Sequence, residues 1–236
     1  MAEIILGLMG GLGLFLYGMR LMSDSLEKAA GAKMRSILEF FTKTPLRGIL
    51  VGTFFTAIIQ SSSAATVMAV SFVNSGLMNL YQAAGVIMGA NIGTTITSQL
   101  IAFNLSELAP VIIMAGIIML MFSRKIRVQR AGEVLVGFGI LFMGLTSMSS
   151  TMSVLKESTQ VVNAMGSLNS HSLALVTGMA VTAVLQSSSA TVGIILLLAN
   201  QGLLDMRICF FIILGCNIGA CVSALIAGLS GKRDAK

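Results

Sequence analysis

Long apolar stretches make up most of the chain, and short polar or basic segments separate them. Five of these stretches are near or above the length at which a helix crosses the hydrocarbon core of a membrane, so we predict them to be transmembrane helices. They cover residues 4–22, 82–103, 108–123, 131–148 and 208–229. Two further apolar stretches, 48–73 and 174–199, have polar centres that argue against simple spans.

The two polar centres contain the same pentapeptide, Gln-Ser-Ser-Ser-Ala, at positions 60–64 and 186–190. The offset, 186 − 60 = 126 positions, holds without insertion well beyond this motif. It also pairs Gly11 with Gly137, Gly18 with Gly144, Gly52 with Gly178, Thr56 with Thr182, Asn74 with Asn200, and Asn91 with Asn217. One register with this many matches indicates that the two halves are duplicates.

The duplication divides the chain into a first repeat over 1–104, a linking helix and loop over 105–130, and a second repeat over 131–236. Each repeat is expected to contain a re-entrant hairpin, at about 48–75 and about 174–200. The counterpart of the span that begins at 108 would begin near position 234, so we expect the second repeat to be truncated at its C-terminus.

Composition excludes a soluble globular domain, because 56% of the residues are hydrophobic, 10% are charged and the mean hydropathy is +0.93. The formal net charge of +6 comes mainly from basic residues around 23–47, in 124–130 and in the C-terminal tail. This placement indicates a multi-pass protein of the cell membrane and no nucleic-acid partner. The positive-inside rule puts both basic loops and the C-terminus in the cytoplasm.

The same charges orient the two repeats. If the first helix runs inward, the first hairpin enters the membrane from the cytoplasm, and the basic loop 124–130 returns to that side. The second repeat then begins outward, so its hairpin enters from outside. We therefore predict an all-α polytopic membrane protein with inverted structural repeats, each with a re-entrant helical hairpin, whose Gln-Ser-Ser-Ser centres meet near the middle of the membrane.

The Gln-Ser-Ser-Ser centres have the chemistry of an oxyanion site. A Ser hydroxyl caps the half-helix that follows the break, and the first N–H groups of that half-helix lie without partners at its positive end. Ser in membrane helices also bonds to a carbonyl one turn earlier or helps close packing, but four adjacent polar residues are costly in a bilayer unless they are used. The two hairpins would supply six hydroxyls, those of Ser61, Ser62, Ser63, Ser187, Ser188 and Ser189.

A second paired motif, Gly-x-Asn-Ile-Gly, lies at 89–93 and 215–219. Glycines four residues apart favour close helix packing. Packing does not explain an Asn at the same place in both copies, because a membrane-buried amide needs partners. We expect Asn91 and Asn217 either to offer carbonyl oxygens to a sodium ion or to brace the hairpin tips.

Charged residues and His are absent from 48–73, 82–103, 174–199 and 208–229. Dipoles, hydroxyls and amides are thus expected to be the groups that compensate a bound anion, and they cannot neutralise its net charge. A cation should accompany the anion, and sodium accepts oxygen ligands of these kinds. No base is available to activate a Ser nucleophile, so we expect no enzyme activity.

The repeated Gln-Ser-Ser-Ser, followed about thirty residues later by Gly-x-Asn-Ile-Gly, resembles the type II sodium/phosphate cotransporters and their bacterial relatives. The resemblance implies sodium-coupled symport of inorganic phosphate into the cell, with sodium as the coupling ion and no other cofactor. It assigns substrate binding to Gln60, Ser61, Ser62, Ser63, Gln186, Ser187, Ser188 and Ser189. It assigns sodium binding or support to Asn91, Thr94, Thr95, Asn217, Thr66 and Thr191. The second copy has Ala220 and Cys221 where the first has Thr94 and Thr95, so any hydroxyl ligand there is lost.

Expected partners are inorganic phosphate, sodium and the lipid bilayer, with a homo-oligomer and a PhoU-like regulatory protein as further candidates. Two different functions also fit the pattern. One is a non-transporting or regulatory membrane protein, which predicts no sodium-dependent anion binding. The second is a sodium-coupled transporter of another oxyanion such as sulfate.

Overall fold

Helix is the only regular secondary structure in the computed structural model, which describes residues 2–41, 44–103, 105–155 and 170–229. The elements are α1 (Ala2–Phe41), α2 (Pro45–Ile59), α3 (Ser62–Asn74), α4 (Leu80–Ala102), η1 (Leu105–Leu108), α5 (Ala109–Phe122), α6 (Ile126–Leu155), α8 (His171–Leu185), α9 (Ser188–Asn200) and α10 (Met206–Leu229). The prediction of an all-α protein is confirmed.

Four helical segments in the described part of the chain are long and apolar enough to cross a membrane. They are Glu3–Ala30, Leu105–Phe122, Ile126–Ser153 and Met206–Ile226. Each contains most of a predicted span. The fifth predicted span, 82–103, does form a helix, α4, but its Asn, Thr and Gln side chains make it more polar than these four.

Two predicted basic loops are largely helical. Residues 23–41 continue α1 without interruption, and residues 126–130 form the first turn of α6. The predictions of loops over 23–47 and 124–130 are therefore wrong for these residues. Polar and basic residues marked the ends of the apolar stretches, but Glu, Lys, Arg and Met favour helix as well as Leu does, so nothing in these segments terminates it.

The duplication is visible in the helices themselves. Adding 126 to the bounds of α2 and α3 gives the bounds of α8 and α9, and α4 and α10 begin 126 positions apart. Gly76 and Gly202, which follow α3 and α9, both adopt a positive φ, of 73° and 68°. The division into repeats at 104 and 131 stays a prediction.

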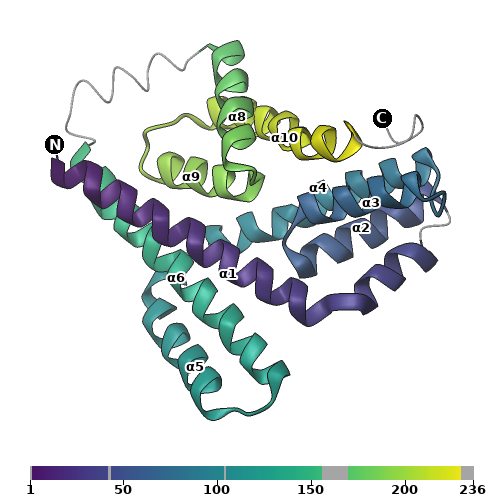
Figure 1. Ribbon diagram of the computed structural model, residues 1–236. Coiled ribbons are helices and arrows are strands. Elements are labelled where there is room, and N and C mark those ends of the chain that lie inside the picture. Colours follow the sequence, from purple (N-terminus) through teal and green to yellow (C-terminus); the bar gives the residue numbers. More distant parts are fainter. Residues whose placement is uncertain (1, 42–43, 104, 156–169, 230–236) are drawn as a thin grey trace.

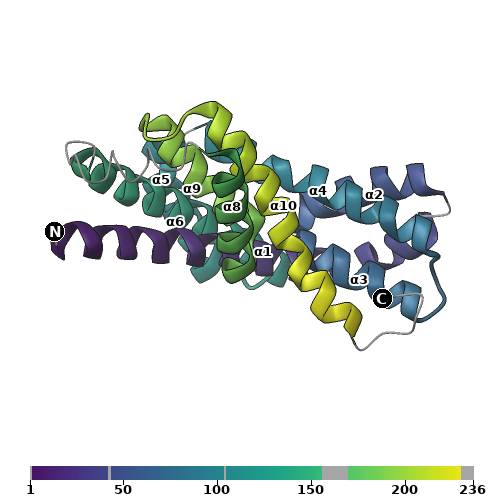
Figure 2. The ribbon, with the colours of Figure 1, turned by 90° about the horizontal axis from the view of Figure 1, so that it is seen from above.

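The helices gather into two equivalent groups with α1 and α6 beside them. Figure 1 shows α2, α3 and α4 on one side and α8, α9 and α10 on the other, with α1 passing both groups and α5 paired with α6. Seen from above, α10 runs from its own group toward α3, which it contacts (Figure 2).

Glycines set the closest helix contacts. Gly52 and Gly89 bring α2 and α4 together, and Gly178 and Gly215 do the same for α8 and α10. Each helix pair is parallel, because Pro45, Ile49 and Thr53 lie against Gly85, Gly89 and Gly93 in the same order. Since α3 runs back from the turn that ends α2, each group runs forward, back and forward again. This is the path of a hairpin followed by a full helix.

Candidate functional site

Each hairpin turns at its Gln-Ser pair. Gln60 ends α2 with a left-handed backbone (φ 61°) and Gln186 ends α8 in the same way (φ 55°). This conformation costs a residue with a side chain roughly 1–2 kcal/mol, so it persists only where neighbouring contacts hold it. The helix break that the sequence predicts at the Gln-Ser-Ser-Ser centres is confirmed.

The Gln side chains supply those contacts. Gln60 Nε2 donates to Ala57 O at 2.5 Å, and its Oε1 accepts a short hydrogen bond from Thr97 Oγ1 of α4. Gln186 repeats the arrangement: it donates to Ala183 O at 2.6 Å and accepts from Ser223 Oγ of α10 at 2.6 Å.

The sequence interpretation missed both hydroxyl partners. Thr97 and Ser223 lie 126 positions apart, so their shared hydroxyl was the available signal. The side chains of both Gln residues thus contact the protein at the hairpin tips.

A Ser caps the half-helix that follows each tip. Ser61 Oγ accepts from Ala64 N at 3.2 Å, and Ser187 Oγ accepts from Ala190 N at 3.3 Å. The first backbone bonds of the two helices start at Ala65 N and Thr191 N. The amide N–H groups and hydroxyls of Ser62, Ser63, Ser188 and Ser189 are therefore the donors left at two positive helix ends.

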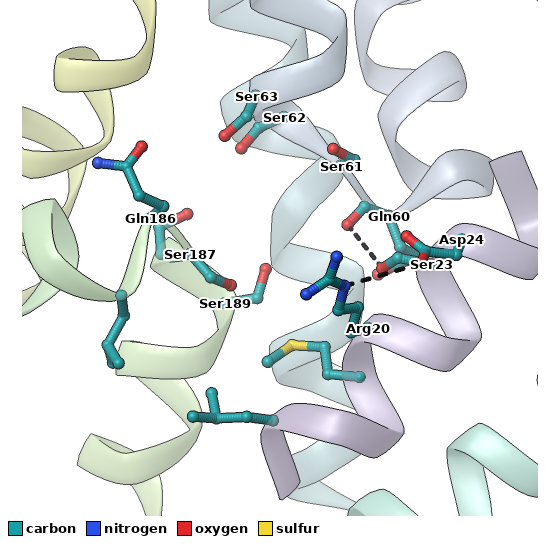
Figure 3. Close-up of a pocket in the computed structure, with 14 residues that line it drawn as sticks. Arg20, Ser23, Asp24, Gln60, Ser61, Ser62, Ser63, Gln186, Ser187 and Ser189 are labelled. Carbon is teal, nitrogen blue, oxygen red and sulfur yellow. Dashed lines mark hydrogen bonds and ion pairs between the residues drawn. The ribbon is translucent and has the colours of Figure 1, made fainter. Parts of the chain in front are cut away.

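These groups converge on one pocket of about 350 Å³, which we call the hairpin pocket. It is lined by Leu16, Met19, Arg20, Ser23, Asp24, Gln60, Ser61, Ser62, Ser63, Leu185, Gln186, Ser187, Ser188 and Ser189. Figure 3 shows the two Gln-Ser runs on opposite sides, with Arg20 reaching between them. All eight predicted substrate residues thus lie together, as expected from two approaching hairpins, while their role in binding stays a prediction.

Charged side chains also line the hairpin pocket, which corrects the expectation that only dipoles, hydroxyls and amides would face an anion. Arg20 and Asp24 lie one turn apart on α1, and Arg20 Nε is 3.8 Å from Asp24 Oδ2. Arg20 lies near the end of the predicted span 4–22. Its helix continues through a long apolar segment, where an ionisable residue is usually functional.

The hairpin pocket excludes the six residues predicted to bind or support sodium. Asn91, Thr95 and Asn217 are exposed elsewhere, and Thr66 is partly buried. Thr94 Oγ1 donates to Ala90 O and Thr95 Oγ1 to Ile92 O within α4, which is the local bonding common for Thr in helices. Their role in sodium binding stays a prediction.

The two hairpins differ in one buried contact. In the second, Thr182 Oγ1 donates to Thr191 Oγ1 at 2.9 Å, and Thr191 Oγ1 donates to Ser187 O at 3.2 Å. In the first, the counterpart of Thr191 is Ala65, which has no hydroxyl. Thr56 Oγ1 is consequently the single buried side-chain polar atom that lacks a partner in the described part of the chain.

We expect Thr56→Val to raise the unfolding free energy by about 1 kcal/mol, because it removes a buried hydroxyl whose desolvation nothing offsets. Thr182→Val should lower the unfolding free energy by about 1 kcal/mol, because it removes a made hydrogen bond. Thermal unfolding of both variants in detergent measures the two changes in stability at equivalent positions of the two repeats. Equal destabilisation by both substitutions would show that the Thr56 hydroxyl has a partner after all.

Comparison with known proteins identifies the family. The model of the Na+/Pi-cotransporter family matches residues 14–150 and 153–233. The uncharacterized protein YqeW of Bacillus subtilis (strain 168) is 32% identical over 225 residues, which cover 94% of this chain and 72% of that protein. No solved structure matches the chain.

Two named groups of relatives extend the match. The putative inorganic phosphate export protein YjbB of Escherichia coli (strain K12) is 25% identical over 234 residues, 98% of this chain but only 43% of YjbB. The sodium-dependent phosphate transport protein 2A of Rattus norvegicus is 35% identical over 97 residues, 40% of this chain and 15% of that protein. With the family model matching nearly the whole length, this chain belongs to the Na+/Pi-cotransporter family.

Proposed function

We propose that the chain carries inorganic phosphate across the cell membrane together with sodium ions, in the direction of entry into the cell. The hairpin pocket is the observation that carries the proposal. Two half-helices direct their free N–H groups and four serine hydroxyls into about 350 Å³, which suits a small oxyanion.

Sodium coupling rests on the charge of the pocket lining. Among the described residues, Arg20 is the one cation of this lining and Asp24 the one anion, so the lining is neutral before a ligand enters. Phosphate brings negative charge, and hydroxyls and amides stabilise that charge without cancelling it. A sodium ion that enters with phosphate restores the balance.

The packing of α1 on α6 supports the inverted arrangement on which alternating access would depend. Gly11 lies against Gly144, and Gly18 lies against Gly137. Gly144 and Gly137 are the counterparts of Gly18 and Gly11, so the two equivalent helices pack antiparallel through the same surface. This is the contact pattern of a two-fold axis. We propose that the axis lies in the membrane plane and that the basic ends near 23–47 and 124–130 face the cytoplasm.

Phosphate export is a second candidate, favoured by the name of the YjbB relatives, although this chain spans less than half of their length. Sulfate transport and a non-transporting role are the competing functions that the experiment below separates from phosphate transport. A homo-oligomer and a PhoU-like partner stay predictions.

The test is thermal unfolding of the purified chain in detergent, with phosphate or sulfate, each in sodium and in potassium. A ligand that binds the folded state raises its stability by RT ln(1 + [L]/Kd), or about 2.7 kcal/mol at 100 times Kd. We expect stabilisation by phosphate in sodium, a much smaller effect in potassium, and none by sulfate.

Equal shifts with sulfate would assign another oxyanion, and no shift under any condition would favour the non-transporting role. Direction is then measured in proteoliposomes with an imposed sodium gradient. Phosphate that follows sodium inward supports symport into the cell, and phosphate movement against or without the gradient supports export.

A further inference from the structure

We propose that Arg20 and Asp24 form a charge switch in the hairpin pocket. Arg20 leaves Asp24 to bind the phosphate held by the hairpin serines, and the freed Asp24 carboxylate takes the sodium ion. This inference rests on the proposed function and deepens it, because it names the two side chains that link anion binding to cation binding.

The first observation is that the ion pair is weak and that the N–H donors of Arg20 have no hydrogen-bond acceptor among the described residues. The distance of 3.8 Å between Nε and Oδ2 exceeds that of a charge-assisted hydrogen bond. The Arg20 and Asp24 side chains are 82% and 50% exposed, so the surrounding protein does not hold them in place. The guanidinium makes no hydrogen bond to the described residues, and its planar fork of N–H donors matches two oxygens of phosphate.

The second observation is where the pair stands. Arg20 and Asp24 lie inside the long apolar segment of α1, where charges normally face a cavity or another charge. They line the same pocket as the free serine donors, and Figure 3 shows Arg20 reaching between the two hairpins. An oxyanion on those serines would therefore compete with Asp24 for the guanidinium.

The third observation is that the backbone beneath the pair is held on two sides. Ser23 Oγ donates to Gln60 O at 3.3 Å, which ties α1 to the first hairpin tip. Ser25 Oγ donates to Glu133 Oε2 at 2.8 Å, and Arg130 Nη1 also donates to that oxygen at 2.8 Å, which ties α1 to α6. Exchange of partners thus needs only side-chain rotation.

The pair also breaks the symmetry of the duplication. At offset 126 the counterparts of Arg20 and Asp24 are Thr146 and Ser150, which carry no charge. Thr146 lines a different pocket, of about 660 Å³, between α6, α9 and η1. One switch therefore serves both hairpins, and one charge exchange accompanies each anion.

The switch is tested by measuring phosphate affinity of the purified full chain by titration calorimetry in sodium and in potassium. We expect Arg20→Gln to weaken phosphate binding in sodium at least about tenfold, because it removes charge-assisted hydrogen bonds. The phosphate affinity of Arg20→Lys should lie between those of the unaltered chain and Arg20→Gln, because lysine keeps the positive charge but lacks the planar fork of N–H donors. The control is Arg47→Gln, because Arg47 is exposed and lies outside the hairpin pocket. This variant should bind phosphate as tightly as the unaltered chain.

Asp24→Asn tests the link between the two ions directly. Without the Asp24 carboxylate, Arg20 is free to bind phosphate whether or not sodium is present. Phosphate should therefore bind in potassium as tightly as in sodium, and the ratio of the two affinities should fall to about one. Unchanged affinity in Arg20→Gln, or full sodium dependence in Asp24→Asn, overturns the switch while the proposed function stands. Absence of phosphate binding in the unaltered chain overturns both, so the two failures are distinguishable.

Discussion

The double substitution Ser62→Ala and Ser188→Ala is expected to abolish stabilisation by phosphate without unfolding the protein. Both serines occupy the first helical position after a hairpin tip, and their hydroxyls line the hairpin pocket. Two hydrogen bonds to a charged ligand contribute about 3–6 kcal/mol together, so their loss weakens binding by about 100-fold or more. Alanine is a better helix former than Ser, which should preserve α3 and α9.

Thermal unfolding with and without phosphate in sodium measures this effect. Ser71→Ala is the matched control, because Ser71 is exposed on the same helix α3 and lies outside the pocket. It should keep the full phosphate response. A double variant that keeps that response as well would remove the hairpin site as the place where phosphate binds.

The second large effect concerns packing. We expect Gly89→Ala or Gly215→Ala to destabilise the fold by about 3 kcal/mol or more, because the added methyl group overlaps backbone that cannot move aside. A Cβ on Gly89 would lie 2.1 Å from Ile49 O, and one on Gly215 would lie 2.0 Å from Leu175 O. The parallel helix pairs would have to separate, and the Thr97 and Ser223 contacts that hold the hairpin tips would be lost with them.

Gly13→Ala is the control, because a Cβ there meets no atom within 4 Å. It should be neutral or slightly stabilising, since Ala exceeds Gly in helix propensity by about 1 kcal/mol. Size-exclusion profiles and unfolding temperatures in detergent measure all three variants. A Gly89→Ala protein as stable as Gly13→Ala would contradict the close helix contact.

Much of the candidate site was predictable from local pattern. The doubled Gln-Ser-Ser-Ser run indicated the helix breaks, because polar residues inside an apolar stretch are stable only where they cap or bind. Shared glycines at one offset predicted the duplicate helices, and α2, α3, α8 and α9 follow that offset residue by residue. Hydropathy predicted the long spans, since the length of an apolar run is a local property.

Other features depend on contacts that no local pattern contains. No local pattern predicted that the Gln side chains bond to the backbone and to Thr97 or Ser223. Their role in substrate binding stays a prediction. The basic residues that follow the first apolar stretch were predicted to form a loop, but α1 continues through them to Phe41.

The chain by itself therefore determined the membrane class, the duplication and the position of the two serine runs, because hydropathy, spacing and helix capping act between near neighbours. The tertiary structure alone decided which other residues face those serines. Arg20 and Asp24 lie far from both runs in the sequence, and they enter the hairpin pocket because α1 packs along both hairpin groups. Which face of a helix meets a pocket depends on that packing, and no periodicity within α1 specifies it.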